Sequence, residues 1–165
     1  MGRVLKQTAR AALLLAICGG GAAMPSTATA QEKGDVAVVV NRDVPVDNLT
    51  LADLRRLVLG DREFWPASVR VTLLVRAPVA HERDVLLKSV CQMTEAQFRQ
   101  HWIAKVFRAD TAVAPKIVYS NEMAVDLVNR IPGAITFVDV SHMSSRLKVV
   151  RIDGRLPGEK GYPLR

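Results

Sequence analysis

Apolar runs typical of strands recur along the chain from residue 36 onward. Residues 36–40 are a continuous run of valine and alanine, which predicts a strand covered on both faces. Residues 69–75 alternate apolar with partly polar side chains and predict a second strand. Shorter apolar runs predict three more strands, at 116–119, 134–138 and 147–152.

Segments with helical spacing separate these strands. Thr50 is placed to cap a helix, with Asp53 at the third position of a capping box and Gly60 at its end. Another helix begins near Pro78 and runs to Val90. Each of these helices lies between two predicted strands or follows one directly.

Two more capped helices follow along the chain. Thr94 and Gln97 form a second capping box, and Asn121 is placed to cap the later helix. The apolar positions that share one helical face are Phe98, Trp102 and Val106 in the first helix, and Ala124, Leu127, Val128 and Ile131 in the second. Strands alternating with helices predict an α/β domain with a mixed, mostly parallel sheet flanked by helices.

The first 30 residues differ from the rest of the chain. Basic residues occur within the first ten positions, an apolar run occupies 11–17, and Ala28-Thr29-Ala30 provides a cleavage site of the A-x-A type. This order predicts a signal peptide at 1–30 and a mature domain at 31–165. We therefore expect a periplasmic or secreted protein.

Cys18 raises the alternative of a lipoprotein signal, but Ile17 stands where that signal requires a small side chain. The apolar run at 11–17 is too short to span a bilayer, and no run of spanning length follows it. We expect no membrane span in the mature domain.

The basic charge of the chain is partly carried by this N-terminal segment. The 165 residues include 23 Lys and Arg against 16 Asp and Glu, a net charge of +7. Three of the basic residues precede residue 31, which leaves a net charge of +4 in the mature domain. The remaining charges are interspersed, and only 5% of the residues are aromatic. These features argue against nucleic-acid binding and remain compatible with an anionic ligand.

No catalytic or metal-binding motif stands out in the sequence. His81, His101 and His142 fall on different predicted elements and lack the spacing of metal ligands. Cys91 ends an apolar helical stretch, which is typical of a buried thiol. We expect no cofactor, no metal ion and no enzymatic activity; a hydrolase or redox enzyme that uses His81, Glu82 or Cys91 is a weaker alternative.

Two loops are candidates for a ligand site. One runs from Arg76 to Glu82 after a predicted strand, and the other is Ser120-Asn121. In open α/β sheets, ligands bind where the carboxyl ends of strands meet helix N-termini. On spacing alone, the favoured interpretation is that Arg76 is a surface charge and Asn121 only a helix cap. The candidate ligand-binding residues are Arg76, Ala80, His81, Ser120 and Asn121.

Several segments match one known family in the same order along the chain. They are Val36-Ala-Val-Val-Val-Asn41, Leu49-Thr-Leu-Ala-Asp-Leu-Arg-Arg-Leu-Val-Leu-Gly60, Phe64-Trp65-Pro66, Ser120-Asn-Glu-Met-Ala-Val-Asp-Leu-Val, Ile131-Pro-Gly-Ala-Ile-Thr-Phe-Val138, Val149-Val-Arg-Ile-Asp-Gly154 and Gly161-Tyr-Pro-Leu164. In these segments, the chain resembles the phosphate-binding proteins of ABC importers, which belong to the periplasmic binding protein type 2 superfamily. The resemblance covers nearly all of the mature domain.

The resemblance implies one lobe of a two-lobed protein, with half of the ligand cleft missing. In the family, an arginine precedes a turn of glycine, serine and threonine that holds phosphate. Arg76 stands at the matching place, but residues 78–82 lack the hydroxyl groups, and Val79 replaces a glycine. Glu82 adds a carboxylate near the place of the anion, which opposes phosphate binding.

The resemblance therefore implies an exported, non-catalytic protein like the solute-binding components of ABC importers. Its binding of phosphate or another small oxyanion is expected to be weak or lost. An ABC permease or another periplasmic protein is the implied partner. The alternative is a protein-interaction scaffold that has lost its small ligand.

Overall fold

A five-stranded sheet is the centre of the part of the chain that the computed structural model describes, residues 34–111 and 113–165. The strands, in the order in which they lie side by side, are β4 (Lys116–Val118), β3 (Thr72–Arg76), β5 (Ala134–Asp139), β1 (Val36–Val40) and β6 (Lys148–Val149). β3 pairs in parallel with β4 and β5, whereas β1 runs antiparallel to β5 and β6. A separate parallel pair joins β2 (Asn48–Leu49) to β7 (Arg151–Ile152). The prediction of a mixed, mostly parallel sheet is confirmed.

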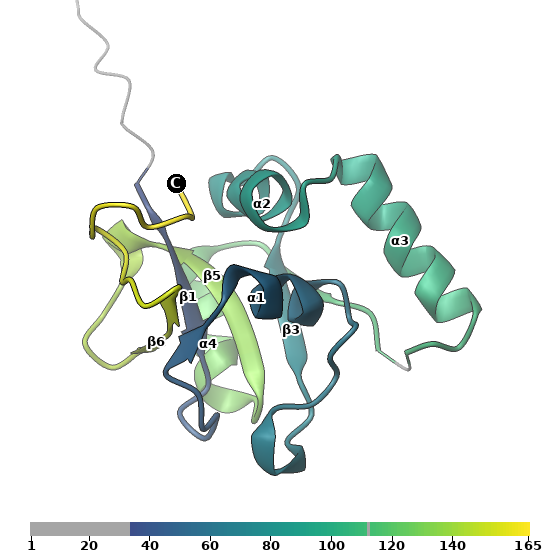
Figure 1. The fold of residues 1–165 in the computed structure, drawn as a ribbon, viewed down its shortest axis with the longest axis horizontal. Coiled ribbons are helices and arrows are strands. Elements are labelled where there is room, and N and C mark those ends of the chain that lie inside the picture. Colours follow the sequence, from purple (N-terminus) through teal and green to yellow (C-terminus); the bar gives the residue numbers. More distant parts are fainter. Residues whose placement is uncertain (1–33, 112) are drawn as a thin grey trace, which may run out of the picture. The chain divides into compact units, whose positions relative to one another are not determined.

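Helices cover both faces of this sheet (Figure 1). They are α1 (Leu51–Val58), α2 (His81–Val85), the π-helix η2 (Leu86–Cys91), α3 (Glu95–Phe107) and α4 (Asn121–Arg130). Two short 3₁₀ turns, Pro66–Ser68 and Val140–His142, complete the regular structure of the described residues. α2 continues directly into η2, so the helix predicted from Pro78 begins three residues later, at His81.

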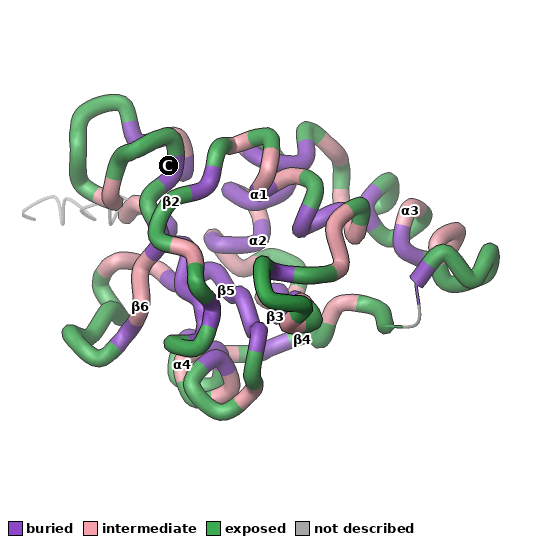
Figure 2. Tube along the Cα trace, turned by 60° about the horizontal axis from the view of Figure 1, so that its bottom comes forward, coloured by how far each residue is buried: buried purple, intermediate pink, exposed green. Residues whose placement is uncertain are grey.

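The core has two layers, one on each face of the sheet. Val38 and Phe137 point toward the layer that contains α1, η2 and part of α3, and Val39 and Val138 point toward α4. All five residues of β1 are buried, as predicted for a strand covered on both faces. β5 is buried along nearly its whole length, whereas much of α3 is exposed (Figure 2).

Local hydrogen bonds start the helices largely where the sequence predicts. Thr50 Oγ1 accepts a hydrogen bond from the backbone N–H of Asp53 at 3.0 Å. Thr94 and Gln97 form the complete capping box, with distances of 3.2 and 2.8 Å. The third cap differs from the prediction, because Ser120 rather than Asn121 caps α4. These bonds join groups within three residues of each other, which makes them readable from sequence.

The predicted apolar face of α3 is correct for two residues and wrong for the third. Phe98 and Trp102 are buried, but Val106 is 46% exposed. A spacing of four residues turns the side chain by about 40° at each step, because the helix has 3.6 residues per turn. Val106 also lies in the last turn of α3 and belongs to neither buried core cluster.

Two predicted strands have different bounds in the structure. Residues 69–71 bond to the segment 63–65 before β3 begins at Thr72. The predicted strand at 147–152 is divided between β6 and β7, which belong to different sheets. The apolar residues of both segments do pack in the core. The bounds of β3, β6 and β7, however, depend on the strands with which they pair, and these lie far away in the sequence.

The predicted signal peptide lies outside the described residues. Within residues 34–111 and 113–165, no helix has the length and apolar character needed to cross a membrane.

Candidate functional site

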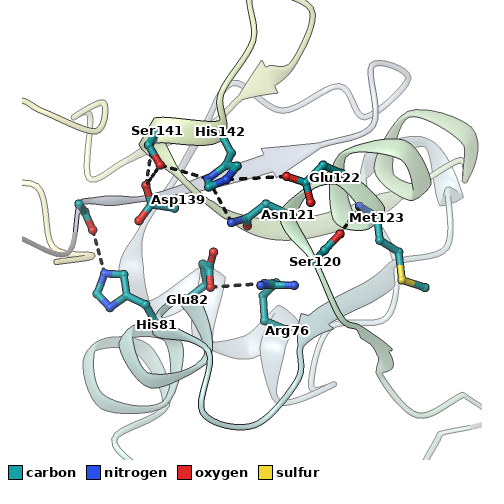
Figure 3. Close-up of polar contacts among 11 residues, drawn as sticks. Arg76, His81, Glu82, Ser120, Asn121, Glu122, Met123, Asp139, Ser141 and His142 are labelled. Atoms are coloured by element: carbon teal, nitrogen blue, oxygen red, sulfur yellow. Dashed lines mark hydrogen bonds and ion pairs between the residues drawn. The ribbon is translucent and has the colours of Figure 1, made fainter. Parts of the chain in front are cut away.

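The carboxyl ends of three parallel-paired strands and their following loops converge at one edge of the sheet (Figure 3). Arg76 ends β3, Ser120 follows β4, and Asp139 ends β5. Parallel strands carry their carboxyl ends to the same edge, so residues far apart in sequence meet there. Both loops that the sequence singled out belong to this cluster.

The Arg76 side chain forms an ion pair with a carboxylate of its own chain. Its Nε donates a hydrogen bond to Glu82 Oε2 at 3.3 Å. The two side chains are only 12% and 4% exposed, so this ion pair is largely withdrawn from water. Arg76 Nη1 is buried and has no hydrogen-bond partner among the described residues. Arg76 is therefore not the exposed loop charge that spacing alone favoured.

The start of α4 contributes a second set of polar groups. Ser120 Oγ accepts a hydrogen bond from the backbone N–H of Met123 at 3.0 Å, so its lone pairs are partly used in capping. Asn121 is the first helical residue, and its Nδ2 donates to His142 Nδ1 at 3.3 Å. Asn121 Oδ1 is buried without a partner among the described residues. Asn121 thus faces the cluster and does not cap the helix.

Two of the five predicted ligand residues contribute no free side-chain donor. His81 Nε2 lies 2.9 Å from the carbonyl oxygen of Gly34, which accepts a hydrogen bond from the Nε2–H tautomer. His81 is thereby directed toward the start of β1, away from Arg76 (Figure 3). Ala80 precedes α2 in an extended conformation and has no side-chain cap to offer. Arg76, Ser120 and Asn121 are the predicted residues that the structure brings together.

Sequence reasoning missed the residues that follow β5. Asp139 Oδ1 accepts hydrogen bonds from the backbone N–H of Ser141 at 2.8 Å and from its hydroxyl at 2.6 Å. His142 Nε2 lies 3.7 Å from Glu122 Oε1. The rule that pointed to the ends of β3 and β4 applies equally to the strand predicted at 134–138, and it would have found this group.

Local hydrogen bonds stabilise the charged form of two carboxylates in the cluster. The pKa of Glu122 is lowered by its own backbone N–H and by the Ser120 hydroxyl, with smaller contributions from His142 and Arg76. For Asp139, burial acts to raise the pKa, but the bonds from Ser141 and the nearby histidines together lower it. Both groups therefore remain ionised at neutral pH.

The cluster at the strand ends holds more carboxylates than cationic side chains. One guanidinium, on Arg76, lies among the carboxylates of Glu82, Glu122 and Asp139. The carboxylate paired with Arg76 reduces the attraction of this guanidinium for an anion. Within the described ranges, no group of three His, Cys, Asp or Glu side chains is arranged to hold a metal ion.

Val79 holds a strained backbone conformation in the loop between Arg76 and α2. Its φ is +67°, and its side chain is 97% exposed. The left-handed region costs a β-branched residue about 1–2 kcal/mol, whereas glycine adopts it freely.

We expect Val79→Gly to raise the free energy of unfolding by about 0.5–1 kcal/mol, after the entropy that glycine gains in the unfolded chain is subtracted. Urea unfolding measures this change. Ala77→Gly is the matched control in the same loop, and because Ala77 does not have a positive φ, that variant is expected to be less stable than the parent. If the urea midpoint of Val79→Gly is lower than that of the parent protein, the backbone at Val79 is not strained.

Cys91 is buried, as the sequence predicts, and lies outside the cluster. Burial raises the pKa of its thiol to about 12, and Arg55 and Arg83 only partly offset that effect. Because the thiolate is the reactive form, we expect Cys91 in the folded protein to react with iodoacetamide at pH 8 only as fast as the protein unfolds. Mass spectrometry with and without denaturant measures the rate at which Cys91 is alkylated. Rapid labelling of the folded protein would contradict this expectation and favour a redox function for Cys91.

No known protein-family profile matches the sequence. Solved structures with the same fold exist. An ABC-type phosphate transport receptor from Vibrio cholerae is 21% identical, with a TM-score of 0.61, over 75% of this chain and 48% of that protein. PstS from Borrelia burgdorferi is 11% identical, with a TM-score of 0.63, over 79% of this chain and 54% of that protein.

A phosphate-binding protein from Stenotrophomonas maltophilia is 12% identical, with a TM-score of 0.56, over 75% of this chain and 40% of that protein. The chain thus spans about half the length of these structures. At such low identities, the likeness establishes the fold. The described part of the chain has the fold of one lobe of a periplasmic binding protein, and its structural neighbours are phosphate-transport substrate-binding proteins.

Proposed function

We propose that this protein is an exported, non-catalytic relative of the phosphate-binding components of ABC importers, in which free phosphate is bound weakly or not at all. The observation that carries the proposal is the buried pair of Arg76 and Glu82 at the carboxyl edge of the sheet. In this proposal, the Glu82 carboxylate takes the place that the free anion has in a binding protein.

The donor set of the cluster supports weak binding. Ser120 is engaged in capping α4, and His81 is engaged with Gly34. Residues 78–82 contain no serine or threonine. Losing one donor to a charged ligand costs roughly 1.5–3 kcal/mol, or about tenfold to a hundredfold in affinity. Two such losses would move a micromolar site to the millimolar range.

Calorimetry with inorganic phosphate tests this proposal. We expect no measurable binding by the purified protein at micromolar phosphate and neutral pH. Glu82→Thr combined with Ala80→Ser restores two hydroxyls and removes the opposing carboxylate, so it should gain phosphate binding. Adding Arg76→Gln to that variant should abolish the gain. Micromolar binding by the unmodified protein would overturn the proposal.

Export is the second part of the proposal, and it rests on the order of residues 1–30. Cleavage after Ala30 would release a protein that starts at Gln31 in the periplasm or medium. N-terminal sequencing of the exported material tests it, since a start at Met1 or at Cys18 contradicts this assignment. An ABC permease is the proposed partner if a ligand is delivered, and another periplasmic protein if none is.

A protein-interaction lobe is the second candidate function. Its supporting observation is an exposed apolar groove beside α3, away from the cluster at the strand ends. In this alternative, the lobe serves as a scaffold and no small ligand is needed.

A further inference from the structure

An apolar groove of about 490 Å³ lies between α3 and the edge strand β4. Its apolar lining includes Phe98, Trp102, Ile103, Val106, Phe107 and Ile117. Phe107 is 89% exposed, and Ile103, Val106 and Ile117 are each nearly half exposed. Several exposed apolar side chains around one groove mark an interaction surface. None of the cluster residues at the strand ends lines this groove.

α3 carries a stripe of side chains that faces away from the core. Relative to Arg99, the residues Ile103, Val106 and Phe107 stand at i+4, i+7 and i+8, which is the spacing of one helical face. All four are exposed and line the groove. Neither buried core cluster of the described residues includes a member of this stripe. The outer face of α3 is therefore apolar and open to a partner.

The groove carries little net charge that a partner must neutralise. Arg83 and Glu95, both in the lining, are joined by two hydrogen bonds of 2.9 and 2.8 Å. Arg99 is exposed and has no salt bridge in the part of the chain that the structure describes. A fitting occupant therefore brings mainly apolar surface, together with one group that can receive the guanidinium of Arg99.

The open edge of β4 does not favour the addition of a strand. β4 has three residues, Pro115 precedes it, and its first residue is Lys116. Short length, proline and lysine are the features by which edge strands avoid backbone pairing. Lys116 and Ile117 point to opposite faces of the sheet, so the charge of Lys116 lies outside the groove. Side-chain contacts along α3 are therefore what holds an occupant.

The stripe on α3 is complementary to the same stripe of a second copy. If two α3 helices run antiparallel about a two-fold axis at Ile103, residue 99 of each lies opposite residue 107 of the other. Phe107 can then enter the groove of the other copy, since a cavity of about 150 Å³ already accommodates benzene. Its ring also offers a face to Arg99 of that copy. Within each copy, Arg83 already makes such a contact, 4.6 Å from the ring centroid of Phe98.

The exposed apolar area is sufficient for a weak dimer. The exposed parts of Ile103, Val106, Phe107 and Ile117 offer on the order of 500 Å² per copy, since one buried aromatic side chain alone accounts for about 150–250 Å². Two copies would bury about 1,000 Å² in total, which is near the lower limit of specific interfaces. We therefore expect a reversible dimer with a Kd of about 10–100 μM.

We propose that this groove is the interface of a two-fold homodimer in which the α3 helices pack antiparallel. Phe107 of each copy fills the groove of the other and stacks on its Arg99, and the two Ile103 side chains meet at the axis. The inference rests on the second candidate function, because it names the partner of the interaction lobe. It does not use the cluster at the strand ends.

Sedimentation equilibrium of the purified exported protein tests this proposal across the micromolar range. Phe107→Ser should weaken dimerisation at least about tenfold. Arg99→Ala should weaken it roughly twofold to fivefold. Arg155→Ala is the matched charge control, since Arg155 is exposed on the C-terminal segment and does not line the groove. Its dimerisation should equal that of the unmodified protein. Because Phe107 is exposed, circular dichroism should show that Phe107→Ser remains folded.

A disulfide cross-link locates the two-fold axis. Ile103→Cys should form a covalent dimer on mild oxidation by oxygen with a copper catalyst, whereas the unmodified protein should not, because Cys91 is buried. Met123→Cys is the matched control. Met123 is 40% exposed against 47% for Ile103, and it lies on α4, which covers the other face of the sheet. Its cross-linking should be much slower.

Three outcomes would overturn the proposal: a monomer throughout this concentration range, a dimer that Phe107→Ser leaves intact, or equal cross-linking by Ile103→Cys and Met123→Cys. A monomer would overturn the second copy as occupant and still allow a different protein partner for the lobe. Phosphate binding by the unmodified protein would contradict the first candidate function only. The proposals therefore fail separately.

Discussion

Replacing Trp102 with alanine is expected to lower the free energy of unfolding by about 3–5 kcal/mol, the usual range for truncating a buried aromatic side chain. The indole is only 8% exposed and packs edge to face against Phe98, with ring centroids 6.4 Å apart. It also fills the space above Gly60, where an added Cβ would lie 2.7 Å from the ring. Gly60 has no side chain that could move into the cavity left by Trp102→Ala, because its positive φ is a conformation that only glycine adopts without strain.

Val106→Ala is the matched control for Trp102→Ala on the same helix. Val106 is 46% exposed, so its truncation should change stability by less than about 0.5 kcal/mol. Urea unfolding followed by circular dichroism measures both variants. Equal midpoints for Trp102→Ala and the parent would show that α3 does not pack as described.

Replacing Glu82 with glutamine is expected to cost about 3–5 kcal/mol, because it leaves the Arg76 charge buried without its carboxylate. Only 12% of the Arg76 side chain is exposed, so water cannot replace the lost partner effectively. Arg76→Gln in the same chain should recover much of the loss, since the unpaired charge is then gone. Phosphate at about 10 mM should stabilise Glu82→Gln by binding the folded state, and should not stabilise the double variant.

An exposed ion pair provides the control for Glu82→Gln. Asp126 and Arg130 lie one helical turn apart on α4, with side chains 53% and 75% exposed. Asp126→Asn should therefore change the free energy of unfolding by only about 0.3–0.5 kcal/mol. If Glu82→Gln proves as mild as Asp126→Asn, the pair at the strand ends is not the buried interaction on which the proposed function rests.

The cluster at the strand ends was predicted only in part from the sequence. The rule that ligands bind at the carboxyl ends of parallel strands led to Arg76, Ser120 and Asn121, which do converge. It did not reveal that Glu82 lies 3.3 Å from Arg76, because the turn geometry of residues 77–81 decides that distance. His81 was expected to contribute, yet its ring bonds to Gly34, which is 47 residues earlier in the chain.

Features that rest on local interactions were predictable from the amino-acid sequence. The caps at Thr50 and Thr94 depend on groups within three residues and appear as predicted, although Asp53 does not complete the capping box expected at Thr50. The run at 36–40 is buried as predicted because five consecutive apolar residues favour a strand covered on both faces. Gly60, with a φ of +71°, also follows the end of α1 as predicted.

Features that depend on residues far apart in the chain became visible only in the folded structure. The antiparallel placement of β1 and the division of 147–152 between two sheets depend on which strands meet. The exposure of Val106 depends on which elements pack against the end of α3. The Arg76–Glu82 pair and the apolar groove also depend on tertiary structure. Several elements that are distant in sequence pack around each of them and determine its burial and its charge, so no local sequence pattern predicts either feature.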